Sequence, residues 1–253
     1  MPLHDWSFMS HIYPFPSSVF TTSMAKEVLI LGNYGVEYQP IVHLKSGTVL
    51  GYEALSRFAY QERVIPPNVF FDALHEDRAL FCKAEATLKG FQFTHRPSEG
   101  TLYVNIDPHI LEDKHASKAV LACLNQQRDF VVELVENSYT TLHAKEIFDV
   151  FLSQNYTLAV DDFLQENSML SLYLLKACHV LKLDRGIIQE LRHDDAFSSV
   201  IQGLIAFAHA KGKTVIFEGV ETEEDLRFAE TLECDSVQGF LFRPLFITHF
   251  NTY

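Results

Sequence analysis

Seven polar residues recur along the chain, each directly after a short apolar run that is rich in β-branched or aromatic residues. Such runs are typical of strands that are buried on both faces. A single polar residue after a strand is often a helix N-cap or a solvated loop residue, but seven in succession favour a site built from many strand ends. The seven residues are Glu53, Asn105, Glu133, Asp161, Lys182, Glu218 and Gln238.

The side-chain types predict a metal-dependent reaction. Carboxylates and an amide form an all-oxygen environment, which favours hard cations such as Mg²⁺ or Mn²⁺ over zinc. Asp161 and Asp162 are adjacent, so they could serve two ions through one bridging oxygen. Lys182 lies in an otherwise apolar run, where a salt bridge to Asp161 or Asp184 is the alternative to a functional role. Paired oxygen-ligated metals, a lysine and a nearby arginine fit hydrolysis of a phosphodiester by metal-activated water.

The spacing of these residues predicts eight strands that alternate with helices. The strand runs are Val36–Val42, Val49–Tyr52, Leu102–Val104, Phe130–Val132, Leu158–Val160, Val180–Leu181, Val215–Phe217 and Ser236–Val237. Helical periodicity occupies Ala79–Phe93, Pro108–Leu124, Ala144–Leu152, Ala196–Lys211 and Glu223–Leu232. Eight strands alternating with helices in 253 residues indicate one α/β domain of the (β/α)8 barrel type, with its active site at the carboxyl ends of the strands.

Composition excludes several classes of protein. A net charge of −13 speaks against binding to long nucleic acids, although bound divalent cations could reverse the local potential at a site for a small anion. No apolar run reaches the length of a membrane span, and the first residues lack the pattern of a secretory signal. The four cysteines are widely separated, which favours reduced thiols. We therefore expect a soluble, cytoplasmic protein. The twelve histidines show no metal-ligand spacing along the chain.

The first 33 residues differ from the remainder of the chain. Prolines and hydroxyl side chains punctuate an aromatic-rich segment, followed by a short helix or strand at Lys26–Leu31. Trp6, Phe15 and Phe20 are too apolar for a free tail, so we expect this arm to pack on the barrel or on a protein partner. A poorly ordered terminus is the alternative. We predict an N-terminal arm at 1–33 and a barrel domain at 34–253.

Ordered motifs along the chain resemble those of the EAL domain family of cyclic di-GMP phosphodiesterases. They are Gln39-Pro40-Ile41-Val42, Glu53-Ala54-Leu55-Ser56-Arg57, Val104-Asn105-Ile106, Glu133-Leu134-Val135-Glu136, Asp161-Asp162-Phe163, Leu181-Lys182-Leu183-Asp184, Glu218-Gly219-Val220-Glu221 and Gln238-Gly239-Phe240. A Glu-Ala-Leu triplet alone carries no weight, but the ordered set is specific. The resemblance implies a modified barrel whose first strand runs antiparallel to the others, and hydrolysis of cyclic di-GMP to linear pGpG.

The resemblance also implies a role for each motif residue. One metal ion would be held by Glu53, Asn105, Glu133 and Asp161. The second would be held by Asp161, Asp162 and Glu218. The catalytic residues would be Lys182, Glu218, Glu53 and Gln238. The substrate contacts would come from Arg57, Leu55, Gln39 and Gln238. Glu136 and Glu221 would support these residues from outside the metal ligands.

Among the catalytic residues, the resemblance implies that Lys182 contacts the attacking water and that Gln238 orients water or phosphate. The cofactors would be two Mg²⁺ or Mn²⁺ ions. Ca²⁺ is larger and more flexibly coordinated, so we expect it to occupy the site and to inhibit.

One loop departs from the family pattern. After Asp161-Asp162-Phe163 the family usually continues with a glycine-rich loop, whereas Leu164 and Glu166 stand here at the two glycine positions. Glycine adopts positive φ at little cost, so these residues imply a strained or displaced loop. In the family this loop is linked to dimerisation and to the second metal site.

The sequence thus predicts an enzyme that lowers cyclic di-GMP, because the chain retains every metal ligand that the resemblance requires. A catalytically weak receptor, which holds the dinucleotide and signals through a protein partner, is the main alternative. A ligand-free adaptor would be expected to lose Arg57 and the acids. The sequence leaves open a homodimer and a protein partner that binds through the N-terminal arm.

Overall fold

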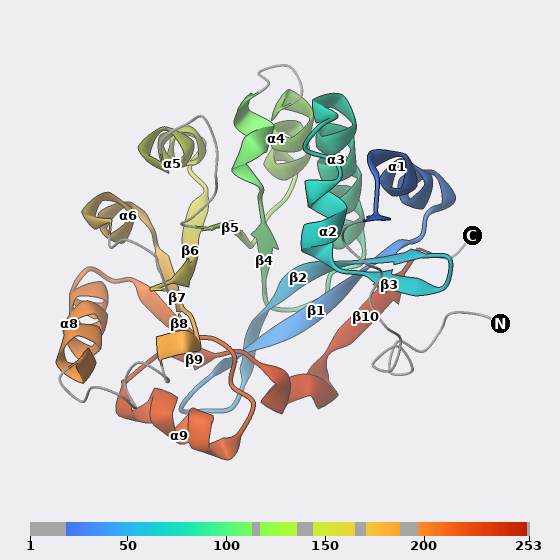
Figure 1. The fold of residues 1–253 in the computed structure, drawn as a ribbon. Helices are drawn as coiled ribbons and strands as arrows, with labels where there is room; N and C mark the ends of the chain where they lie inside the picture. Colours follow the sequence, from blue (N-terminus) through green and yellow to red (C-terminus); the bar gives the residue numbers. More distant parts are fainter. Residues whose placement is uncertain (1–18, 113–116, 136–143, 165–170, 188–196, 252–253) are drawn as a thin grey trace.

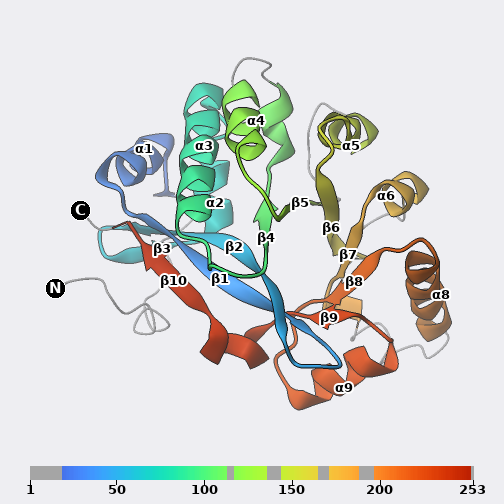
Figure 2. The same cartoon turned by 180° about the vertical axis from the view of Figure 1, so that it is seen from behind.

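The computed structural model describes residues 19–112, 117–135, 144–164, 171–187 and 197–251. Its strands are β1 (Tyr34–His43), β2 (Val49–Tyr60), β3 (Arg63–Ile65), β4 (Thr101–Asn105), β5 (Phe130–Val135), β6 (Thr157–Phe163), β7 (Val180–Leu183), β8 (Thr214–Phe217), β9 (Ser236–Val237) and β10 (Ile247–Phe250). Eight of them close a ring in the order β1-β9-β8-β7-β6-β5-β4-β2, in which β2 pairs again with β1. Figures 1 and 2 show this barrel from opposite sides.

The first strand of the barrel is the exception in direction. β1 is antiparallel to both ring neighbours, β2 and β9. The other ring pairs are parallel. This confirms the predicted modified barrel with an antiparallel first strand. Outside the ring, β3 pairs with β2, and β10 extends the sheet beside β1.

Helices surround the strands (Figure 1). They are α2 (Pro67–Asp72), α3 (Arg78–Thr94), α4 (Ser117–Asn125), α5 (Ala144–Ser153), α6 (Leu172–Ala177), α8 (Phe197–Ala210) and α9 (Glu223–Thr231). The single helix predicted at Pro108–Leu124 is wrong. A short 3₁₀ helix, η3 (Pro108–Glu112), precedes α4 instead, and Asp107 Oδ1 starts it by accepting a hydrogen bond from the backbone N–H of His109 at 2.9 Å. A second 3₁₀ helix, η4 (Phe240–Leu245), leads into β10. None of the described helices combines the length and the apolar character that crossing a bilayer requires.

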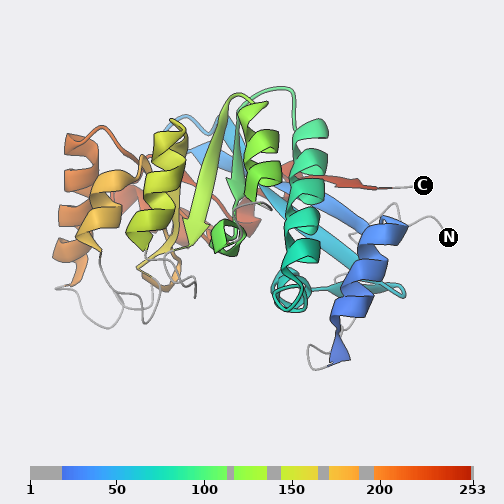
Figure 3. The same ribbon diagram turned by 90° about the horizontal axis from the view of Figure 1, so that it is seen from above.

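The described part of the N-terminal arm packs on the barrel. Helix α1 (Thr22–Leu31) begins four residues before the predicted segment, because the Thr21 side chain accepts a hydrogen bond from Met24 N at 3.4 Å and caps it. The ring of Phe20 lies 6.1 Å from that of Tyr60 and 6.4 Å from that of Phe70, centroid to centroid. Seen from above, α1 lies beyond α3, on the side of the barrel away from α8 (Figure 3). The domain boundary at residue 33 stays a prediction.

Alternation along the strands explains where the polar residues lie. A separate buried cluster fills the barrel interior with Ile41, Tyr103, Val131, Ala159, Val180 and Ile216. In a strand, the residue two positions further on faces the same side, here closer to the carboxyl end of each parallel strand. Those next residues are Asn105, Glu133, Asp161, Lys182 and Glu218. A layer of polar side chains therefore lies directly above an apolar one.

The predicted strand ends were too early for five of the seven polar residues. Glu53, Asn105, Glu133, Asp161 and Lys182 lie within β2, β4, β5, β6 and β7, and only Glu218 and Gln238 follow their strands. The physical reason is that polar side chains on neighbouring strands contact one another in the barrel interior. A polar residue there does not interrupt the backbone pairing. The backbone ladder then continues past it, as the register Asn105 to Glu133 between β4 and β5 shows.

Leu164, the residue directly after β6, has the backbone conformation that glycine favours. Its φ is +65°, in the left-handed region, while its half-buried side chain packs against the core. The strained alternative for this loop therefore holds at Leu164, and Glu166 lies outside the described residues. Left-handed backbone costs a non-glycine residue about 1–2 kcal/mol.

This conformation predicts an inverted order of stability for two substitutions. Leu164→Gly and Leu164→Ala both remove the leucine contacts, but only glycine also relieves the positive φ. We expect the glycine variant to be the more stable by about 1 kcal/mol in chemical denaturation, whereas alanine is ordinarily the more stable of the two. An alanine variant as stable as the glycine variant would show that residue 164 does not have positive φ.

Candidate active site and metal centre

Lys182 is the centre of the polar layer. Its side chain is fully buried, and its Nζ lies 2.7 Å from Glu133 Oε1, 2.7 Å from Asp161 Oδ1, 2.9 Å from Glu218 Oε1 and 3.1 Å from Glu53 Oε2. An ammonium group has three protons, so it cannot satisfy four carboxylates. Lys182 Nζ donates to Glu53 Oε2, whereas Glu133 Oε1 and Asp161 Oδ1 lack a well-directed hydrogen bond despite their closeness to the lysine. The cluster thus holds buried acceptors that one lysine leaves unsatisfied.

Two amide side chains fix the position of Glu53. Asn105 Nδ2 donates to Glu53 Oε1 at 2.6 Å and lies 3.2 Å from Glu133 Oε2. Gln238 Nε2 donates to Glu53 Oε2 at 2.6 Å. The amide oxygen of Gln238 is buried without a partner, so it remains free to accept a hydrogen bond from a bound molecule. The structure therefore brings together all seven polar residues that opened the sequence analysis.

A β-bulge directs two successive acids to the same site. Between Val160 and Phe163 the pairing of β6 with β7 shifts register, which leaves Asp161 and Asp162 opposite Lys182 alone. Asp162 has a φ of +52°, so the backbone turns there instead of alternating. One ligand atom each from Asp161, Asp162 and Glu218 lies within 4.8 Å of the others. Glu53, Glu133 and Asp161 form a second group of the same kind.

A close backbone contact holds the last two strand ends together. The backbone N–H of Val220 donates to Gln238 O at 3.0 Å. A Cβ atom at Gly239 would lie 2.2 Å from Val220 O, so only glycine fits there. This contact positions Glu218 and Gln238 beside each other at the rim.

Burial and mutual repulsion shift the acids away from their usual ionisation. Burial, together with the charge of Glu53, raises the pKa of Glu133 well above its usual value. Burial likewise raises the pKa of Glu218, against the opposing charge of Lys182. For Glu53, burial acts upward, but the Lys182 charge and the hydrogen bonds from Gln238 and Asn105 outweigh it, so its pKa is lowered. Without further cations, Glu133 and Glu218 therefore hold their protons to a higher pH than ordinary glutamates do.

The predicted substrate contacts lie on one face of β2 and beside it. Alternation places Leu55 and Arg57 on the same face as Glu53, and both line a pocket of about 350 Å³ that also reaches Asn105. Arg57 Nη2 lies 2.6 Å from Glu37 Oε1, which also accepts from Gln39 Nε2 at 2.9 Å. Glu37 thus orients two of the predicted substrate residues. Sequence reasoning missed it, although its position two residues before Gln39 in an apolar strand was a usable signal.

Comparisons with known proteins agree with this geometry. The EAL domain family model matches residues 24–244. The chain belongs to the EAL domain family.

Two similar proteins from Pseudomonas aeruginosa share just over a quarter of their aligned residues with this chain. The EAL domain is 28% identical over 237 residues to the bifunctional diguanylate cyclase/cyclic di-GMP phosphodiesterase MucR, covering 83% of this chain and 33% of MucR. It is 27% identical over 237 residues to the cyclic di-GMP phosphodiesterase RocR, covering 88% of this chain and 60% of RocR. The chain therefore spans between a third and three fifths of the length of these relatives.

Solved structures share the fold. A PaMucR phosphodiesterase complex with c-di-GMP superposes with a TM-score of 0.70 at 24% identity, covering 86% of this chain and 93% of that one. A Klebsiella pneumoniae BlrP1 complex with manganese and c-di-GMP gives a TM-score of 0.67 at 23% identity, covering 83% and 55%. Both confirm the modified barrel.

The EAL domain does not bring every predicted residue to the cluster. Glu221 is exposed and pairs with Arg185, while its backbone N–H donates to Asp225 Oδ2 at 3.0 Å. No contact among the described residues joins it to the carboxylates. Glu136 lies outside the described residues, so its supporting role stays a prediction.

Asp162 predicts how metal binding depends on pH. Burial raises its pKa to about 6, and the charges of Asp161 and Asp184 add to the shift. A protonated acid is a poor metal ligand, so protons and cations compete for it. As the pH falls below about 6, Mn²⁺ affinity measured by titration calorimetry should weaken by up to about tenfold per pH unit for each proton displaced. An Asp162→Asn variant should bind more weakly but lose this part of the pH dependence. Equal pH profiles for the two proteins would contradict the assignment.

Proposed function

We propose that this EAL domain hydrolyses cyclic di-GMP to linear pGpG with Mg²⁺ or Mn²⁺ as cofactor. The observation that carries the proposal is the convergence of five carboxylates, two amides and one buried lysine at the carboxyl ends of the barrel strands. If all are ionised, five carboxylates and one ammonium give the cluster a formal charge of −4. An anionic phosphodiester would be repelled from such a site unless cations neutralised it.

The side chains fit two divalent cations. All donors are carboxylate or amide oxygens, the set that Mg²⁺ and Mn²⁺ prefer. One ion would be held by Glu53, Asn105, Glu133 and Asp161. The other would be held by Asp161, Asp162 and Glu218. Bound there, the ions would supply positive charge to the phosphodiester and lower the pKa of a coordinated water.

The other residues of the site act on water and substrate. Lys182 supplies the ammonium that lies within 3.1 Å of four ligand carboxylates, so it holds them in place. Once bound cations take over some of these carboxylates, a proton of the ammonium would become available to a water among them. The free amide oxygen of Gln238 can accept a hydrogen bond from the same water and so orient it. Arg57 offers a planar fork for a phosphate or a guanine edge, and Leu55 offers an apolar wall.

We also propose that the protein acts in the cytoplasm. All four cysteines are free thiols, and Cys82, Cys178 and Cys234 are buried. Reduced thiols fit the cytoplasm, where a soluble second messenger is available.

Incubation with cyclic di-GMP, followed by chromatography, tests the function. With Mg²⁺ or Mn²⁺ we expect linear pGpG, and with a chelator or with Ca²⁺ we expect none. A binding titration in Ca²⁺ runs in parallel. Tight binding of cyclic di-GMP without product in any metal would show that the protein is a receptor and not an enzyme. The absence of both binding and product would show that cyclic di-GMP is not its ligand.

A further inference from the structure

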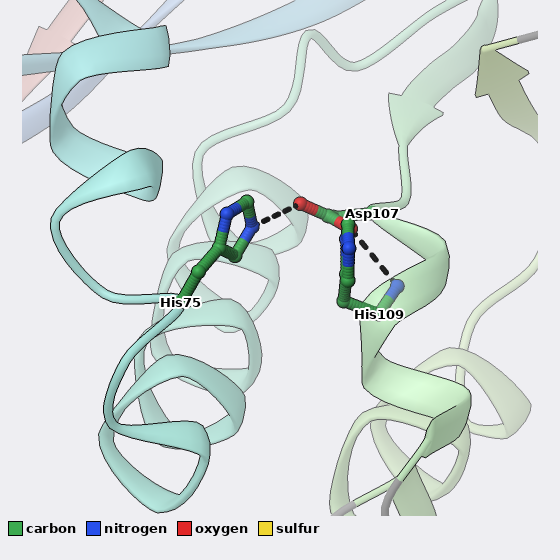
Figure 4. A group of neighbouring side chains, drawn as sticks. All are labelled: His75, Asp107 and His109. Carbon is green, nitrogen blue, oxygen red and sulfur yellow. Dashed lines mark hydrogen bonds and ion pairs between the residues drawn. The ribbon is translucent and has the colours of Figure 1, made fainter. Parts of the chain in front are cut away.

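We propose a second, chemically different metal site, formed by His75, Asp107 and His109, that binds Zn²⁺ or a similar transition-metal ion. The three side chains converge from two segments: His75 follows α2, whereas Asp107 and His109 lie at the start of η3 (Figure 4). His75 Nε2 lies 3.0 Å from Asp107 Oδ2, and His109 Nδ1 lies 2.7 Å from Asp107 Oδ1. One donor atom from each residue lies within 4.8 Å of the others.

The local backbone pre-positions these donors. Asp107 Oδ1 accepts the backbone N–H of His109 at 2.9 Å, so a turn holds the carboxylate beside that imidazole. The two imidazole rings lie 4.5 Å apart, centroid to centroid, with 37° between their planes. Both rings are tied to one carboxylate, and both present a nitrogen to the same small space. An ion there would require little movement of the side chains.

The donor set selects a different ion from that of the carboxylate cluster. Two imidazole nitrogens and one carboxylate suit Zn²⁺, Co²⁺ or Ni²⁺, whereas Mg²⁺ strongly prefers oxygen ligands. The two metal centres of this EAL domain would therefore differ in ion preference, although Asn105 of the first lies only two residues before Asp107.

Access and spare coordination positions distinguish this site from a closed structural one. The side chains of His75, Asp107 and His109 are 33%, 23% and 25% exposed, so an ion can enter. Asp107 and His109 also line the pocket of about 350 Å³ that contains Arg57. Three protein ligands leave a position for water or for an anionic oxygen, as in exchangeable zinc sites.

The pocket wall beside the cluster contains buried oxygens without hydrogen bonds. Glu85 and Gln92 both line the pocket and are each 2% exposed. Glu85 Oε2 and Gln92 Oε1 make no hydrogen bond, and the ion pair from Lys89 to Glu85 is long, at 3.5 Å. The charge of Glu85 is opposed by that of Lys89 in the same wall, so the wall offers a further acceptor beside the cluster and no net charge.

Zinc titration calorimetry tests the site. The experiment uses the full chain with excess Mg²⁺, and also the Asp161→Asn protein, in which the carboxylate centre is weakened. Both proteins should bind one equivalent of Zn²⁺ at the histidine site. His75→Ala and His109→Ala should each weaken that binding by roughly tenfold to a hundredfold or more. His209→Ala is the matched control, because its ring pairs with one acid, Asp235, at 3.1 Å, and it should leave the affinity unchanged.

A spectroscopic measurement keeps the test decisive if a histidine variant folds poorly. Co²⁺ added to the Mg²⁺-loaded protein should give the intense visible absorption of four- or five-coordinate cobalt with nitrogen ligands, and Asp107→Asn should weaken it. The proposal is overturned if the Mg²⁺-loaded protein binds no Zn²⁺, if the His75→Ala/His109→Ala double variant keeps the original zinc affinity, or if cobalt shows only the weak spectrum of six oxygen ligands. Because the readout is metal binding, the result is independent of whether cyclic di-GMP is hydrolysed.

Discussion

Asp161→Asn should reduce the rate of cyclic di-GMP hydrolysis by roughly a hundredfold or more. Asp161 is the one acid that belongs to both groups of candidate metal ligands, so its loss weakens both sites at once. The fold should survive, since one of several mutually repelling buried acids becomes neutral without a change of shape. Steady-state rates of pGpG formation at saturating Mn²⁺ measure the effect.

The control for this substitution is Asp149→Asn. Asp149 is an exposed aspartate on α5 that pairs with Lys145 at 2.5 Å. The same chemical change is thus made at a residue that belongs to neither group of candidate metal ligands. Its rate should match that of the unmodified protein. If Asp161→Asn retained more than about a tenth of the original rate, the carboxylate cluster would not be the catalytic metal centre.

Lys182→Met should lower the free energy of unfolding of the metal-free protein by about 3–5 kcal/mol. Methionine keeps much of the length of the lysine but removes the ammonium that contacts all four carboxylates. Acids whose pKa is raised in the folded state favour folding at low pH, so acidification should restore part of the loss as Glu133 and Glu218 take up protons. Mg²⁺ should restore part of it at neutral pH, because bound cations replace the missing charge.

Urea denaturation with and without Mg²⁺ measures this second effect, and Lys83→Met, at an exposed position on α3, is the control. The control should change stability by less than about 1 kcal/mol. A Lys182→Met protein as stable as the control in chelator would mean that the acids do not depend on the lysine for their charge balance. If Mg²⁺ did not reduce the loss of stability, the charge of Lys182 would not be one that bound cations can replace.

The candidate site was predictable because parallel strands bring their carboxyl ends to one edge. Glu53, Asn105 and Glu133 are far apart in the sequence. Asn105 and Glu133 each lie two residues beyond an interior position of their strand and pair with each other, and Glu53 pairs with the interior residue Tyr103. The bulge was not predictable in the same way. Regular alternation would turn Asp162 away from Asp161. A positive φ at Asp162 directs both acids to the cluster, and no glycine in the sequence indicates this conformation.

Other features depend on contacts that leave no periodic signal. His75 and Asp107 are 32 residues apart and belong to segments that meet only in the folded barrel, so no metal-ligand spacing along the chain revealed them. β10 was missed because it lies beyond the last predicted barrel strand and is defined only by its pairing with β1. The strands continue through five of the polar residues because backbone pairing in the barrel does not stop at a polar side chain.

Anomalous diffraction from crystals grown with Mn²⁺ tests most directly the claim that the carboxylate cluster is a two-metal centre. Two manganese peaks are expected. One should lie among Glu53, Asn105, Glu133 and Asp161. The other should lie among Asp161, Asp162 and Glu218. A single peak would contradict the sharing of Asp161, and manganese bound only outside the cluster, with Lys182 still in contact with all four carboxylates, would contradict the metal centre itself.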